Sequence, residues 1–354
     1  MKKAFLFAGM LIAAALVVTS CGGVKADEHG WYHDYDAAKA VANKQKKDII
    51  LFVSSFDSDE KSSKLNKDVF QTDEFKNSLA KQYVCINMDF SQSEYAKSQV
   101  GPEATEKEKK AAKSVEDKFN KDMKTVAGYS METSPAVFLT TKEGYLISRL
   151  AIDDTVAKTA DFAKLITDQK DQSKKINDLV AAVAAASNLE KAKAIDALYE
   201  ASEPESRYLL AGLISEFITL DKENKTGLAG KYILADANVK AQNAFMDKKY
   251  DDVVKAFVDA SNSPSLSADE KQQALYTAAY TMATTGSTDY DKIGEYFQQS
   301  FDANPQSQYA PQIAQMVEMV KSMKASAAAK AAEQPAAPAP AETAPAAPAA
   351  PAKK

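Results

Sequence analysis

The sequence predicts a chain in two folded parts, an α/β half followed by an all-α half. Two apolar, β-branched runs, "DIILFVSS" at 48–55 and "YVCINMDF" at 83–90, are typical of strands buried on both faces of a parallel or mixed sheet. From about residue 172 the apolar residues recur at helical spacing, and no strand pattern interrupts them. Residues 326–354 are rich in Ala and Pro without hydrophobic periodicity, which predicts a disordered, partly polyproline-II tail.

The first residues predict export. Lys2 and Lys3 precede an apolar stretch of about 15 residues, shorter than the roughly 20 that a membrane-spanning helix needs. The following "VTSC" at 18–21, an aliphatic residue, two small residues and a Cys, resembles the lipobox of bacterial lipoproteins. The resemblance implies a signal peptide over 1–20, a covalent lipid on Cys21 and a tether over 21–30. The alternative is ordinary secretory cleavage beside an incidental Cys.

The elements expected over residues 31–170 alternate between helices and strands. Their order is a helix at 34–47, the strand at 48–55, helical residues 60–81 with a break at "QTDEF", the strand at 83–90, a solvated Glu/Lys-rich helix within 91–118, a hairpin of 134–141 and 145–150, and a closing helix at 153–170.

Residues 172–325 predict paired helices. The helical segments are 174–187, 189–202, 206–220, 227–246, 249–262, 267–285, 289–303 and 308–325, with polar or Pro-containing joints between them. Helix pairs of this length favour a helical-repeat domain. Their aromatic residues are expected mostly in the core, with a binding stripe as the alternative: Tyr250, Phe257, Tyr276, Tyr280, Tyr290, Tyr296, Phe297 and Phe301.

The composition and motifs limit the kinds of function that the sequence predicts. The formal net charge of -5 gives no indication of nucleic-acid binding. His29 and His33 have a spacing that suits a metal on a helix, but Gly30 argues against a helix there. We therefore expect no metal site. No phosphate loop or serine-nucleophile motif is present, so we also expect no catalysis and no cofactor beyond the lipid on Cys21. Cys85 lies in a predicted buried strand and is expected to be a core residue, with a reactive thiol as the alternative.

Three stretches of the first half resemble thioredoxin-like domains of secreted bacterial proteins. They are "GWYHDYDAAKAVANKQKKDIILFVSS" at 30–55, "KLNKDVFQTDEFKNSLAKQYVCINMDF" at 64–90 and "AGYSMETSPAVFLTTKEGYLISRL" at 127–150. The resemblance implies a thioredoxin-like domain over 31–170.

The resemblance also locates the family's reactive site. Its C-x-x-C cysteines fall on Asp59 and Ser62, in "DEKS". The family's reaction needs a thiolate with a lowered pKa, and neither residue is a thiol, so we expect no thiol–disulfide exchange here. Thr133, Ser134 and Pro135 match the family's cis-proline loop, which in active relatives binds extended chains. Peptide binding at this loop and a purely architectural role both remain open.

The second half resembles degenerate tetratricopeptide-type repeats. The resemblance lies in "AQNAFMDKKYDDVVKAFVDASNSP" at 241–264 and "DYDKIGEYFQQSFDANPQSQYAPQIAQMVEMV" at 289–320. It implies a concave surface for protein partners.

Together these observations predict a lipid-anchored protein of the bacterial cell envelope, on the outer membrane facing the periplasm or on the cell surface. We expect it to be redox-inactive and to bind or scaffold other envelope proteins. The alternatives are a thiol–disulfide oxidoreductase relative that acts through Cys85, and a holdase-type chaperone that uses the Pro135 loop.

Overall fold

The computed structural model describes residues 25–131 and 133–333, which belong to two compact units. The first unit takes in the chain up to Ala181 together with Ala201–Leu209, and the second takes in Ala182–Glu200 and the chain from Leu210 onward. The predicted signal peptide, Cys21 and the Ala/Pro-rich residues from 334 lie outside the described residues. No helix within the described ranges is long and apolar enough to cross a membrane.

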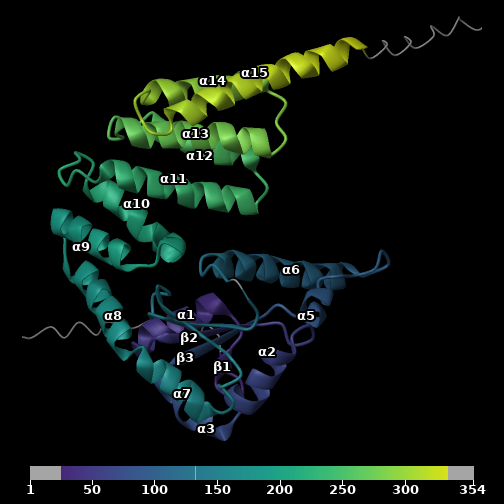
Figure 1. Ribbon diagram of the computed structural model, residues 1–354. Helices are drawn as coiled ribbons and strands as arrows, with labels where there is room; N and C mark the ends of the chain where they lie inside the picture. The colour runs from purple at the N-terminus through teal and green to yellow at the C-terminus, as the bar shows by residue number, and fades with distance from the viewer. Residues whose placement is uncertain (1–24, 132, 334–354) are drawn as a thin grey trace, which may run out of the picture. The chain divides into compact units, whose positions relative to one another are not determined.

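The first unit contains a five-stranded mixed sheet (Figure 1). Its strands are β1 (Trp31–Tyr32), β2 (Ile49–Ser54), β3 (Val84–Asp89), β4 (Ala136–Thr140) and β5 (Leu146–Leu150). Their order is β1-β3-β2-β4-β5, with β1, β3 and β2 parallel and β4 and β5 antiparallel to their neighbours. The predicted strands and hairpin are confirmed. Strand β1 was not expected, because two residues are too few to form a pattern.

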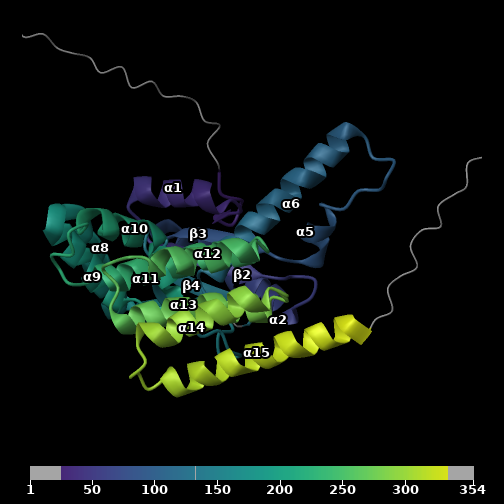
Figure 2. The same ribbon diagram turned by 90° about the horizontal axis from the view of Figure 1, so that it is seen from above.

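Helices connect these strands and follow the last of them. They are α1 (Tyr35–Gln45), α2 (Glu60–Leu65), the π-helix η1 (Asn66–Phe70), α3 (Asp73–Asn77), α4 (Leu79–Gln82), α5 (Gln92–Ala96), α6 (Glu106–Ala127), α7 (Thr159–Asp168) and α8 (Lys170–Ala185). The expected break at "QTDEF" is present, because Thr72 caps α3 by accepting a hydrogen bond from the Phe75 amide at 3.1 Å. Figure 2 shows α6 reaching beyond the sheet, and its first turns are exposed.

The two faces of the sheet have different cores. On one face, the alternate residues Ile49, Leu51 and Val53 of β2 pack with α1 and α6. The other face carries an aromatic cluster that includes Trp31, Phe52, Phe70, Phe75 and Phe162, in which the Trp31 and Phe75 rings stack with centroids 5.3 Å apart. This cluster packs η1, α3 and α7 against the sheet. Because η1 follows α2 directly, the packing also positions α2, whose first residues come shortly after the end of β2.

The second unit is entirely helical in its described residues. Its elements are the rest of α8, α9 (Asn188–Ala201), the last residue of the 3-10 helix η2 (Pro204–Leu210), α10 (Ala211–Leu220), α11 (Ala229–Met246), α12 (Tyr250–Ser261), α13 (Ala268–Thr284), α14 (Tyr290–Ala303) and α15 (Ala310–Glu333). Helices α11 to α15 stack in chain order (Figure 1). Buried alanines and aromatics such as Ala278, Phe257 and Phe297 fill the spaces between them. The all-α class predicted for this half is confirmed.

Two boundaries differ from the sequence prediction. The first unit extends past residue 170 into α8, because Asp48 accepts hydrogen bonds from the Ser173 hydroxyl at 3.2 Å and the Asn177 amide at 2.9 Å. The last helix runs to Glu333, whereas the tail was expected to begin at residue 326. Ala and Lys dominate residues 324–332, and both are good helix formers.

Candidate functional site

Asp59 and Ser62 lie at the junction between β2 and α2, where the resemblance placed them. Asp59 is the N-cap of α2, and its carboxylate accepts a hydrogen bond from the Lys61 amide at 3.0 Å. The same carboxylate accepts a hydrogen bond from the Ser62 hydroxyl at 2.6 Å. Ser62 is fully buried, so its hydroxyl is closed to a substrate. The pair therefore fixes the helix start and offers no reachable nucleophile.

The structure brings the predicted proline loop to the same place. The Ser134–Pro135 peptide bond is cis, and the Ser134 hydroxyl donates a hydrogen bond of 3.1 Å to Asp59 Oδ2. Pro135 is buried and Thr133 is exposed. One carboxylate thus connects the helix start to the loop before β4.

Asp57, which sequence reasoning did not single out, fixes the loop that precedes Asp59. Its two carboxylate oxygens accept hydrogen bonds from the backbone amides of Gln92 at 2.8 Å and Ser93 at 2.6 Å, at the start of α5. These backbone hydrogen bonds, above all the one from Ser93, lower the pKa of Asp57. The loop is held on its other side by the Ser63 hydroxyl, which donates to the Phe56 carbonyl at 2.6 Å. The one sequence signal for the role of Asp57 is its position between a predicted strand and a predicted helix.

Cys85 is the free cysteine of the described residues, and it is fully buried in β3. It lies opposite Trp31 in the strand register, on the aromatic face of the sheet. Burial strongly raises the pKa of its thiol, so the thiolate that attacks disulfides does not form near neutral pH. The predicted core role of Cys85 agrees with this placement.

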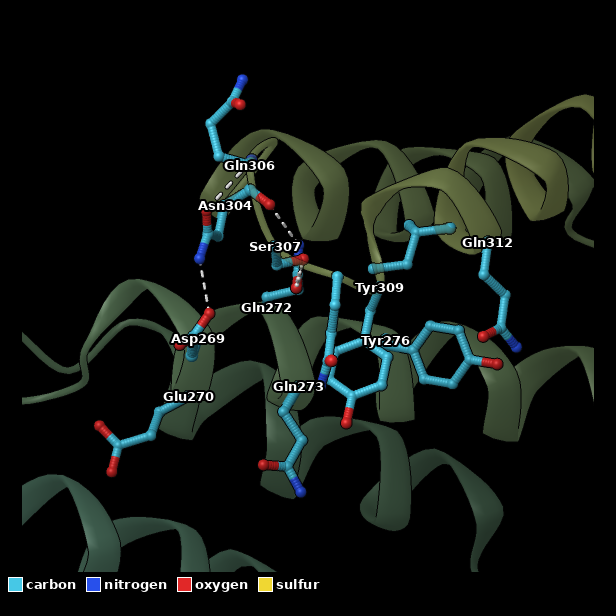
Figure 3. Close-up of a pocket in the computed structure, with 12 residues that line it drawn as sticks. Asp269, Glu270, Gln272, Gln273, Tyr276, Asn304, Gln306, Ser307, Tyr309 and Gln312 are labelled. Carbon is cyan, nitrogen blue, oxygen red and sulfur yellow. Dashed lines mark hydrogen bonds between the residues drawn. The ribbon is translucent and has the colours of Figure 1, made fainter.

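A second candidate site lies in the helical unit, between α13 and the start of α15 (Figure 3). It is a pocket of about 810 Å³. Its lining combines amides, tyrosines and two acids: Gln272, Gln273, Asn304, Gln306, Gln308 and Gln312; Tyr276 and Tyr309; Asp269 and Glu270; with Ser307 and Ile313. We call this the α13–α15 pocket. Sequence reasoning did not predict it.

Gln272 holds the wall of this pocket in place. Its buried amide nitrogen donates to the carbonyls of Ser300 at 3.1 Å and Asn304 at 2.8 Å, and its amide oxygen accepts from the Ser307 hydroxyl at 2.5 Å. Asn304 in turn donates to the Asp269 carboxylate at 2.5 Å. These hydrogen bonds join the end of α14 and the α14–α15 loop to α13, and so position one wall of the pocket.

The pocket lies where two similar helix pairs, α12–α13 and α14–α15, meet. Residues of α12 recur 40 positions later in α14 in the pairs Tyr250 and Tyr290, Val253 and Ile293, and Phe257 and Phe297. The paired core residues have matching burial, since Val253, Ile293, Phe257 and Phe297 are all buried. Tyr280 is 48% exposed and Tyr250 37% exposed, so the aromatic residues of this region are divided between core and surface.

Comparison with known proteins supports this division of the chain. Residues 30–119 match a family model described as thioredoxin-like, and residues 228–326 match one described as the C-terminal domain of an uncharacterised protein. The first unit is thioredoxin-like. Its fold matches that family, whereas the thiol positions hold Asp59 and Ser62.

One curated relative matches a longer part of the chain than either family model. A protein of Treponema pallidum (strain Nichols), named as an uncharacterized protein, is 26% identical over 187 residues. The matched segment covers 53% of this chain and 62% of the length of that protein. No solved structure matches the chain.

Proposed function

We propose that the protein is a lipid-anchored component of the bacterial cell envelope that binds other envelope proteins and carries out no thiol chemistry. The lipid would be attached at Cys21, in the sequence "VTSC". Two or more acyl chains hold a protein stably on a membrane without a spanning helix. The thioredoxin-like unit would then act as a folded support and not as an enzyme.

The α13–α15 pocket is the observation that carries this proposal. Its polar lining groups are mainly amides and phenols, with the carboxylates of Asp269 and Glu270 at one end. Amides and phenols recognise polypeptide backbone through hydrogen bonds. Tyr276 and Tyr309 add flat apolar surface, and tyrosine is common where proteins bind each other. An extended segment of a partner protein suits such a lining.

The residues at the thioredoxin-like site support the proposal that the protein carries out no thiol chemistry. The Asp59 carboxylate is occupied by a backbone amide and by the hydroxyls of Ser62 and Ser134. Cys85 is buried and its thiol keeps its proton. The unit therefore has the geometry of a redox domain without an accessible thiol among its described residues.

A photo-crosslinking experiment in living cells tests the proposal. A photoreactive residue replaces Gln312, in the pocket, or Gln299, an exposed glutamine on α14 outside it. We expect one discrete protein adduct from position 312 in the membrane fraction, lost when Tyr276→Ala and Tyr309→Ala are added, and no such adduct from position 299. Equal adducts from both positions, or none from position 312, would contradict the proposal.

A further inference from the structure

The α13–α15 pocket has hydrogen-bonding groups without partners. Within the described residues, the side-chain amides of Gln273, Gln308 and Gln312 make no hydrogen bond, and neither do the hydroxyls of Tyr276 and Tyr309. No Lys or Arg is among the described residues that line the pocket. A ligand with many acceptor oxygens and no phosphate or carboxylate would satisfy these groups. The carbonyls of an extended polypeptide meet that description.

Tyr276 and Tyr309 indicate which kind of extended polypeptide the pocket would bind. Tyr309 is 59% exposed and Tyr276 is half-buried, and Figure 3 shows both rings between α13 and the start of α15. Aromatic rings in a groove are the usual recognition surface for proline-rich segments in the polyproline-II conformation. Proline lacks an N–H group, so a chain of this kind presents mainly carbonyls, which the glutamine amides can meet.

One end of the pocket is acidic. Asp269 and Glu270 lie in the first turn of α13, and neither pairs with a Lys or Arg in the part of the chain that the structure describes. One oxygen of each carboxylate is taken by Asn304 or by the Ser267 cap, which leaves the other oxygen available. Asp269 precedes Tyr276 by seven residues, which is about 10 Å along a helix. A fitting ligand thus carries a positive charge about that distance from its apolar contact.

The Ala/Pro-rich segment of this chain has both features. Pro345, Pro348 and Pro351 recur every third residue, and a polyproline-II helix has three residues per turn, so these prolines would share one face. The next charged residues are Lys353 and Lys354. In a polyproline-II conformation Pro351 and Lys354 would be about 9 Å apart, close to the spacing along α13 between Tyr276 and Asp269.

We propose that residues 345–354 of the chain bind in the chain's own α13–α15 pocket. The prolines would pack against Tyr276 and Tyr309, and the two lysines would lie at Asp269 and Glu270. This inference rests on the proposed function, since it makes the segment a competitor of the partner protein for one site. The partner class follows as well: an extended proline-rich segment followed by basic residues.

The length of chain between the pocket and the segment permits this contact. Helix α15 begins directly after Tyr309 and is about 36 Å long from Ala310 to Glu333. The twelve residues from Glu333 to Pro345 span about 37 Å at the polyproline-II rise. A chain that turns back after Glu333 therefore brings Pro345 to the pocket.

A binding measurement tests the inference with the full mature chain in detergent. The probe is a fluorescent peptide of residues 334–354, added to the wild-type chain or to a tail variant carrying Pro345→Ala, Pro348→Ala and Pro351→Ala. We expect saturable binding to the tail variant, and binding at least about tenfold weaker to the wild-type chain, whose own segment occupies the pocket. Adding Tyr276→Ala and Tyr309→Ala to the tail variant should weaken binding by a similar factor, with Gln299→Ala as the neutral control.

Three results of the binding measurement would overturn the inference. They are no saturable binding up to about 1 mM peptide, binding that the tyrosine substitutions leave unchanged, and equal binding to the wild-type chain and the tail variant. A wild-type chain whose mass by light scattering rises with concentration, while the tail variant stays monomeric, would assign the segment to a second copy and also overturn the version stated here. Circular dichroism checks that each variant is folded. If the peptide fails to bind but the crosslink from position 312 persists, the inference fails and the proposed function stands.

Discussion

Asp59 and Ser134 are 75 residues apart in the sequence, yet the Ser134 hydroxyl donates a hydrogen bond of 3.1 Å to the Asp59 carboxylate. The contact joins the two segments that, by resemblance, form the reactive site of thioredoxin-like domains. In this chain the contact is between a helix cap and the residue before a cis-proline. The site keeps its geometry and holds groups that stabilise the fold.

Removal of the Asp59 carboxylate should destabilise the first unit. Asp59→Ala loses the N-cap of α2 and the acceptor for Ser62 and Ser134, so we expect a loss of about 1–2 kcal/mol. Denaturant unfolding followed by the fluorescence of Trp31, a buried residue of this unit and the one tryptophan of the sequence, measures it. Lys61→Ala, an exposed change in the same helix, is the control. An Asp59→Ala chain as stable as this control would show that the cap contributes nothing.

Cys85 should be chemically silent in the folded protein. Burial raises the pKa of its thiol; Lys47 lowers this pKa to a smaller extent, and Asp27 raises it slightly further. Iodoacetamide at pH 8 should therefore label the thiol only after denaturation. The folded pKa lies above the unfolded value, so the stabilisation is present below about pH 8.5 and is lost as the pH rises further. The Trp31-monitored stability should therefore fall less steeply above that pH in Cys85→Ala than in the wild-type chain. Rapid labelling of the native protein would refute the buried, protonated thiol.

Gln272 and Gln273 are neighbours with different expected effects. Gln272→Ala removes the donor to the buried carbonyl of Ser300 and to that of Asn304, and the acceptor of the Ser307 hydroxyl, which should cost about 1–3 kcal/mol in the helical unit. Gln273→Ala changes an exposed side chain and should cost less than about 0.5 kcal/mol. Far-UV circular dichroism during unfolding measures both, while the Trp31 signal should stay unchanged. Equal costs would mean that the Gln272 hydrogen bonds do not stabilise the unit.

Cys21→Ala should release the protein from the membrane. The lipid on Cys21 is the expected anchor, and no helix of the described residues can replace it. Carbonate-washed membranes from cells that express the wild-type or substituted chain should hold the wild type only, with Cys85→Ala as the cysteine control. Retention of the Cys21→Ala chain after the wash would require a different anchor.

The parts that the sequence could predict depend on local patterns. Buried strands such as 48–55 and the proline at 135 each leave a signal within a few residues. The α13–α15 pocket leaves none, because Gln272 and Ser307 are 35 residues apart and meet only through the packing of α13 against the α14–α15 loop. The extension of the first unit into α8 depends likewise on the contact between Asp48 and Asn177, which no local pattern encodes.

The central claim is that the protein acts by binding through its helical unit and not by thiol chemistry. The most direct test is the yield of the partner adduct crosslinked from position 312, measured in cells for the otherwise wild-type chain, Cys85→Ala, and Tyr276→Ala with Tyr309→Ala. The account predicts an unchanged yield for Cys85→Ala and a loss of about tenfold or more for the tyrosine pair. A yield that depends on Cys85 and is indifferent to the tyrosines would contradict it.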